Sequence, residues 1–147
     1  MYEYLVSACL AGVNCRYDGS NNINSKVKKL VNEGKALPIC PEVMAGLGIP
    51  RPMCEIKIYK NDEKSVINEN GLELTSNFKE VAKKCLKLAE IMDIKKAILK
   101  SKSPSCGSKY IYDGTFSGNL IKGKGITAEY LSEKGIDIFT EKEIEKI

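Results

Sequence analysis

The chain has 147 residues, of which 43% are hydrophobic and 29% are charged, and this composition is typical of one globular domain. Its net charge is only +4, and no run of basic residues interleaved with aromatics points to a nucleic-acid groove. No apolar stretch approaches the roughly 20 residues of a membrane span, and the N-terminus opens on a strand-like segment rather than a signal peptide. We therefore expect one cytoplasmic domain, residues 1–147, with no membrane and no stable nucleic-acid partner.

The first part of the chain has the pattern of a β-α-β unit. An apolar run at residues 4–6 predicts a short buried strand, and small and polar residues follow it. Asn24 or Ser25 can cap a helix that ends near Gly34, and residues 36–39 predict a second strand. A strand, a helix and a strand within about 40 residues indicate a parallel pair.

The middle of the chain predicts a hairpin and a long helix. Residues 55–59 and 65–68 alternate apolar and polar side chains, so we expect a small hairpin outside the main sheet. An apolar stripe over residues 77–93 predicts the longest helix, with Asn77 and Glu80 in a capping-box pattern.

The remaining segments complete the alternation of strands and helices. They are a third parallel strand at 97–99, a glycine-rich surface loop over the site at 110–125, a helix from Thr127 to about Lys134, a strand at 136–139, and a short helix capped by Thr140 and Glu143. The expected fold is α/β, a Rossmann-like three-layer sandwich with a short, mainly parallel sheet and a small hairpin excursion.

Six cysteines and the absence of histidine restrict the chemistry. Without histidine, Ser/His and Cys/His nucleophilic pairs and mixed Cys/His zinc sites are excluded. In a reducing compartment, clustered thiols are more often metal ligands or catalysts than disulfides.

Three of the cysteines lie just past the end of a predicted strand: Cys9, Cys40 and Cys106. Ligands of open α/β sheets bind at this edge, so we expect these thiols to converge on one metal site. The absence of a local C-x-x-C pair argues against a structural zinc site, whereas thiolates suit zinc, copper(I) and iron–sulfur clusters. We expect Cys85 and Cys54 to be structural.

Polar residues flank these thiols, and each also has a plainer interpretation. Glu42 either points into the same cavity or caps the next turn, and Ser103 and Ser105 are either turn formers or hydroxyls that position a water molecule. Lys100, Lys102 and Arg16 either attract an anionic substrate or lie on the plain surface. Cys15 remains open as a fourth ligand, an auxiliary sulfur-accepting thiol or a residue without a role.

Four motifs together resemble the thiouracil desulfidase (TudS) family, formerly a domain-of-unknown-function family. They are S-A-C-L through C-R-Y-D-G at residues 7–19, C-P-E with G-L and P-R-P at 40–52, S-P-S-C-G at 103–107, and Y-D-G-T-F-S-G at 112–118. The resemblance covers nearly the whole chain. Cys15 and Cys54 depart from the usual family pattern, so neither receives a ligand role from it.

The resemblance implies a 4Fe–4S cluster held by Cys9, Cys40 and Cys106, with one iron open to the sulfur of a thiolated pyrimidine such as 4-thiouracil or 4-thio-UMP. Glu42 would be the catalytic base, and Ser103 the catalytic serine, with Ser101 and Ser105 as alternatives. The implied reaction is a hydrolysis without electron transfer that releases hydrosulfide.

For substrate binding we expect Arg16, Asp18 and Ser105. Two other classes of function stay open: a non-enzymatic metal or sulfur carrier that uses four thiols for one ion, and a thiol redox protein with a Cys9–Cys15 disulfide.

Overall fold

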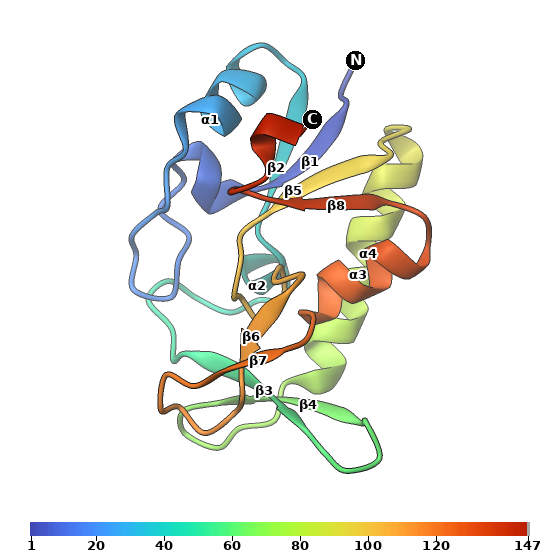
Figure 1. The fold of residues 1–147 in the computed structure, drawn as a ribbon. Coiled ribbons are helices and arrows are strands. Elements are labelled where there is room, and N and C mark those ends of the chain that lie inside the picture. The colour runs from blue at the N-terminus through green and yellow to red at the C-terminus, as the bar shows by residue number, and fades with distance from the viewer. Residues whose placement is uncertain (147) are drawn as a thin grey trace.

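A four-stranded parallel sheet forms the centre of the computed structural model, which describes residues 1–146 (Figure 1). Its strands are β1 (Tyr4–Ser7), β2 (Ala36–Ile39), β5 (Lys96–Leu99) and β8 (Asp137–Thr140), in the order β2-β1-β5-β8. β1 pairs with β2 and β5, and β5 pairs with β8, each in parallel. The expected α/β class and the predicted strands are confirmed.

Helices cover both faces of this sheet, which gives three layers. Leu5, Ala97 and Leu99 pack with residues of α3 (Thr75–Ile91) and α4 (Ile126–Glu133). Tyr4 and Val6 face the other way and pack with α1 (Ser25–Asn32) and the 3-10 helix η2 (Ile144–Lys146). Successive side chains of a strand point to opposite faces, so strands this short are apolar throughout when both faces are covered. Figure 1 shows α1 on the opposite side of the sheet from α3 and α4.

Two antiparallel hairpins extend from the lower end of the sheet in Figure 1. The expected one consists of β3 (Cys54–Ile58) and β4 (Lys64–Asn68), and Ile56 and Val66 pack on Phe78 of α3. The other consists of β6 (Tyr110–Tyr112) and β7 (Leu120–Lys122). The prediction of an irregular loop at 110–125 was therefore wrong in part, because strands of three residues are too short to show a period of two.

The sequence pattern predicted the N-terminus of α1 correctly and that of α3 incorrectly. Asn24 caps α1, and its side chain accepts hydrogen bonds from the backbone of Lys26 and Val27, as predicted. α3 begins at Thr75, so the capping box at Asn77 and Glu80 was wrong. The Thr75 hydroxyl instead accepts a hydrogen bond of 3.0 Å from the Val66 amide of β4, which fixes the helix start against the hairpin.

The N-terminus of α4 is capped by carbonyl groups of another loop rather than by Thr127. Thr127 lies inside the helix with its hydroxyl buried and unpaired, and Gly125 occupies the cap position. The amide of Ile126 donates to the Pro104 carbonyl at 2.9 Å, and that of Ala128 donates to the Ser105 carbonyl at 3.0 Å. The first turn of a helix has free amides that need such partners. The loop that carries Cys106 and the start of α4 therefore stabilise each other.

Two further local features bear on the predictions. A short helix, α2 (Pro41–Met44), follows β2, and four residues are too few for a helical period to reveal it in the sequence. Near the C-terminus, the Thr140 amide donates to the Glu143 carboxylate and the Lys142 amide donates to the Thr140 hydroxyl. These bonds close a turn, and η2 begins only at Ile144, so the prediction that Thr140 caps the last helix was wrong. Among residues 1–146, no helix has the length and apolar character needed to cross a membrane.

Cys85 provides a test of the core. It is fully buried on α3, and its sulfur lies 3.9 Å from the sulfur of Met44. We expect Cys85→Ser to lower the free energy of unfolding by about 1–3 kcal/mol, because a polar hydroxyl would replace the thiol among buried apolar side chains. Lys84→Ser on the exposed face of the same helix should change it by only about 0.5 kcal/mol. Urea unfolding measures both; a Cys85→Ser protein as stable as Lys84→Ser would contradict the core assignment.

Candidate functional site

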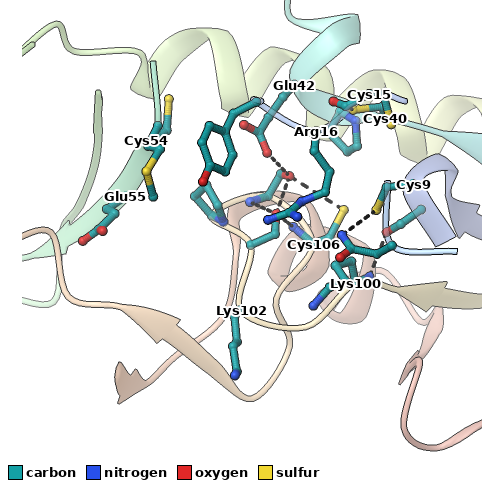
Figure 2. Close-up of a pocket in the computed structure, with 18 of the residues that line it drawn as sticks. Cys9, Cys15, Arg16, Cys40, Glu42, Cys54, Glu55, Lys100, Lys102 and Cys106 are labelled. Atoms are coloured by element: carbon teal, nitrogen blue, oxygen red, sulfur yellow. Dashed lines mark hydrogen bonds between the residues drawn. The ribbon is translucent and has the colours of Figure 1, made fainter. Parts of the chain in front are cut away.

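The site lies where three neighbouring parallel strands end. Cys9 lies in the 3-10 helix η1 (Ala8–Ala11) directly after β1, Cys40 is the N-cap of α2 directly after β2, and Cys106 lies in the loop that follows β5. The order β2-β1-β5 brings these carboxyl ends to one edge of the sheet. All three cysteines line a single cavity of about 550 Å³ (Figure 2).

Burial raises the pKa of two of these thiols, Cys106 and Cys9. Desolvation raises the pKa of Cys106, against the opposing effects of the Ser7 and Ser105 hydroxyls. Desolvation also raises the pKa of Cys9, against the opposing effects of an Asn22 amide at 3.6 Å and of the charges on Lys100 and Arg16. Thiolates are the species that bind metal. A metal group held by these residues would have to displace protons from thiols whose pKa is raised.

The remaining cysteines divide between the cavity and the core. Cys15 lies beside Cys40 in Figure 2, and burial together with this neighbour raises the pKa of Cys15 to about 12. Cys54 on β3 lines another part of the cavity, and burial raises its pKa to about 12, with the Glu42 charge adding to the effect. Cys85 lies in the core as predicted. All six cysteines are free thiols.

Glu42 is held between two different donors. The guanidinium of Arg51 donates from Nε to Oε1 at 3.4 Å, and the hydroxyl of Ser105 donates to Oε2 at 3.4 Å. Both contacts are long for hydrogen bonds, so the carboxylate is oriented but keeps lone pairs open to the cavity. Figure 2 shows the carboxylate of Glu42 directed toward the sulfur of Cys106.

The two serines beside Cys106 have different roles in this network. Ser103 Oγ accepts hydrogen bonds from the amides of Ser105 and Cys106, at 3.1 and 3.0 Å. Its own proton is then free to point at Ser105 Oγ, 2.9 Å away. The single proton of Ser105 goes to Glu42 or to the Cys106 sulfur, since a hydroxyl donates only one hydrogen bond. The hydroxyl that contacts Glu42 is therefore that of Ser105.

Of the expected substrate-binding residues, Arg16 and Ser105 line the cavity and Asp18 does not. Asp18 instead accepts hydrogen bonds from the amide and hydroxyl of Ser20, at 3.0 and 2.5 Å, and these bonds lower its pKa. Arg16 donates to the same Ser20 hydroxyl and lies over the ring of Tyr17. Asp18 thus shapes the loop that carries Arg16. Figure 2 shows the Arg16 guanidinium extending over the cavity toward Cys106.

The loop after β5 carries two lysines, Lys100 and Lys102, whose surroundings differ. Lys100 forms an ion pair with Glu141 at 3.1 Å, and Ser101 donates to the same carboxylate at 2.9 Å. Ser101 lines the cavity but is already engaged by this pair. Lys102 also lines the cavity, and its backbone adopts a left-handed conformation with φ of 70°. A left-handed backbone is unfavourable for lysine and is found where loop geometry demands it.

A loop at residues 113–118 covers another part of the cavity, as expected for the segment over the site. Tyr112, Phe116 and Gly118 line the cavity. Glu55 of β3 is 4% exposed, and one of its oxygens accepts hydrogen bonds from the amides of Gly114 and Phe116 at 3.0 and 3.1 Å. The buried carboxylate therefore fixes this loop on the hairpin.

Several site residues were not identified from the sequence. Arg51, Asn22 and Glu55 contact Glu42, the Cys9 sulfur and the 113–118 loop respectively. These contacts join residues that are 9, 13 and 59 positions apart, and no local periodicity or spacing predicts them. The one available signal was the position of Arg51 between two prolines in a turn-rich segment.

The donor set suits an iron–sulfur cluster. Within the described residues, no group of three His, Cys, Asp or Glu side chains is placed to hold a single metal ion. In a cubane cluster each cysteine binds a different iron, and the sulfurs stand farther apart than the ligands of one ion. Three thiols with no imidazole, lining a cavity of about 550 Å³, fit such a group.

Comparisons with known proteins identify the family of this chain. The model of the 2-thiouracil desulfurase family matches residues 4–143. A protein of Bacillus subtilis strain 168, YbbK, described as uncharacterized, is 40% identical over 148 residues that cover 97% of this chain and 98% of YbbK. A solved structure described as the [4Fe-4S]-dependent thiouracil desulfidase TudS (DUF523Vcz) superposes with a TM-score of 0.89 at 38% identity, over 99% of this chain and 95% of that one. The chain belongs to the 2-thiouracil desulfurase family.

Proposed function

We propose that this protein is a 4Fe–4S-dependent desulfidase that hydrolyses the C=S bond of a thiolated pyrimidine, such as 4-thiouracil or 4-thio-UMP, to C=O. One water molecule is consumed and sulfur leaves as hydrosulfide, so no electron donor is needed. The observation that carries the proposal is the meeting of three thiols with a carboxylate–hydroxyl pair in one cavity. The family and the TudS structure support it.

Cys9, Cys40 and Cys106 would hold the cluster. When bound, it supplies an iron with an open coordination position, a Lewis acid suited to thione sulfur. Around it, the hydroxyl of Ser7 favours the thiolate form of Cys106, and the Asn22 amide donates to the Cys9 sulfur. Such donors stabilise thiolate charge and orient the ligands.

Glu42 is the general base of the proposed reaction. It takes a proton from a water molecule that attacks the ring carbon, and it has free lone pairs toward the cavity for this purpose. Positioned acid–base groups typically contribute factors of about 10² to 10⁴ to the rate. The Ser105 hydroxyl lies between Glu42 and Cys106, so it is placed to orient the same water.

Positive side chains favour an anionic or electron-rich substrate. Arg16 extends over the cavity, and Lys100 and Lys102 line it. Lys100 is already paired with Glu141, whereas Arg16 is held by a neutral serine. We therefore expect Arg16 to contribute more than Lys100 to the binding of a substrate phosphate.

The decisive test is turnover by anaerobically reconstituted protein with 4-thiouracil, 2-thiouracil and 4-thio-UMP side by side. Hydrosulfide and the oxo pyrimidine should form in equal amounts without a reductant. Glu42→Gln should lower kcat by about 10² to 10⁴ while iron content stays constant. Iron-loaded protein that consumes none of these substrates would favour a carrier, and an active metal-free protein with a stable Cys9–Cys15 disulfide would favour a redox role.

The ligand assignment predicts a contrast between two cavity cysteines. Cys106→Ala should fail to hold the full complement of about four irons per chain and should lose the visible absorbance of the cluster. Cys54→Ala, in the same cavity but outside the ligand set, should keep both. Iron analysis and absorbance spectra measure the difference; full iron binding by Cys106→Ala would overturn the assignment.

The serine network predicts a second contrast. Ser105→Ala removes the hydroxyl beside Glu42 and should lower kcat by about 100-fold. Ser103→Ala leaves two amides of the cysteine loop unpaired and should lower the free energy of unfolding by about 1–3 kcal/mol. Steady-state kinetics and urea unfolding separate these effects. Stable Ser103→Ala protein with the larger loss of kcat would instead make Ser103 the reacting hydroxyl.

A further inference from the structure

Arg51 forms a largely buried ion pair with Glu42, the proposed base. Its side chain is 5% exposed and that of Glu42 is 14% exposed, with 3.4 Å between Nε of the arginine and Oε1 of the carboxylate. Removing one member of a buried ion pair leaves the other as an uncompensated charge. The orientation of Glu42 therefore depends on Arg51.

Two segments hold Arg51 in place: the loop that contains Cys15 and Tyr17, and the turn that contains Arg51 itself. Its Nη2 donates to the Cys15 carbonyl at 2.8 Å and its Nη1 donates to the Gly48 carbonyl at 3.3 Å, while its own amide donates to the Tyr17 carbonyl at 2.9 Å. Only a planar fork with several N–H donors can make these contacts and still reach Glu42. A lysine at this position has one charged atom and cannot replace the set.

Arg51 is not placed as a substrate-binding group. Each of its three nitrogens already donates to the protein, and the side chain is nearly inaccessible. Arg16, the other guanidinium of the cavity, shows the opposite pattern: it is bonded to Ser20 and extends toward Cys106. Arg51 is thus placed to hold Glu42, whereas Arg16 is placed to contact a substrate in the same cavity.

We infer that Arg51 is a positioning residue that holds Oε1 of Glu42 so that Oε2 faces Ser105 and the attacking water. This inference rests on the proposed function. Because the contact to Cys15 lies on the loop beside Cys40, the same side chain aligns the base with the thiol end of the cavity. It acts through Glu42, the carboxylate to which its Nε donates.

Arg51→Gln tests this assignment in the reconstituted holoenzyme. Misplacement of a catalytic group by about 1 Å costs about 100-fold in rate, so kcat should fall by about that factor with KM within about 2-fold of the wild type. In the Glu42→Gln background, Arg51→Gln should lower kcat by less than about 3-fold, because residues that act through one contact are non-additive. Arg51→Lys should recover only part of kcat.

The matched control is Arg16→Gln, which removes the same charge from the same cavity without touching Glu42. As an expected substrate-binding residue, Arg16 should affect KM more than kcat, which is the opposite of the split expected for Arg51→Gln. Crystal structures of both variants give a readout independent of turnover: Glu42 should lose its contact with Ser105 in Arg51→Gln and keep it in Arg16→Gln.

Defined outcomes overturn the inference. If the wild type turns over substrate and Arg51→Gln is equally active, Arg51 does not position Glu42. An unchanged Glu42 in the crystal structure of Arg51→Gln would exclude the role as well. A 100-fold loss that persists in the Glu42→Gln background would show that Arg51 acts on another group. If Arg51→Gln does not fold, Arg51→Lys takes its place: a wild-type kcat together with an unmoved Glu42 in that variant would also exclude positioning by Arg51. A wild type without turnover would instead refute the proposed function, and the crystal structures would still decide the placement of Glu42.

Discussion

The parallel pairing of β2, β1 and β5 is the constraint on which the site depends. Parallel strands end at the same edge of a sheet, so residues that follow them meet even when they are far apart in sequence. Cys9, Cys40 and Cys106 occupy these three positions, and β1 lies between its two partners. Displacing any one of these strands would move a thiol out of the cavity. The apolar layers on both faces of the sheet therefore hold the site together as much as its own hydrogen bonds do.

Polar groups beside the thiols form a chain of hydrogen bonds whose last contacts are the longest. Backbone amides fix Ser103, Ser103 orients Ser105, and Ser105 reaches Glu42 and the Cys106 sulfur through longer contacts. The outermost contacts are thus the ones that can change when a ligand enters. A preorganised inner shell with a few open lone pairs is the arrangement that acid–base chemistry in a buried site requires.

Much of this could be predicted because it depends on patterns local to each strand and loop. Short apolar runs located the four strands, and the positions of Cys9, Cys40 and Cys106 after three of them located the site. Asp18 was misplaced because a short side chain in a turn satisfies its own backbone first, here at Ser20.

What the sequence could not reveal depends on contacts between distant segments. Arg51 and Glu42 are neighbours only because α2 and the turn after it fold back on themselves, and the loop carbonyls that start α4 leave no trace in its own residues. Cys54 was expected to be structural; it is buried and also lines the cavity, which its place before a hairpin strand did not indicate.

Gly125 limits the sequence changes that the protein can tolerate near the loop that carries Cys106. A Cβ atom at this position would lie 2.5 Å from the carbonyl carbon of Ser105, and the Gly125 amide donates to the Gly107 carbonyl at 2.6 Å. The helix entrance and the cysteine loop are therefore in backbone contact, with no side chain between them to absorb a shift. Insertions or domain fusions introduced between β7 and α4 would be transmitted to Cys106, whereas the distant β3–β4 turn at Asn61 and Asp62 offers a place where added sequence leaves the thiols undisturbed.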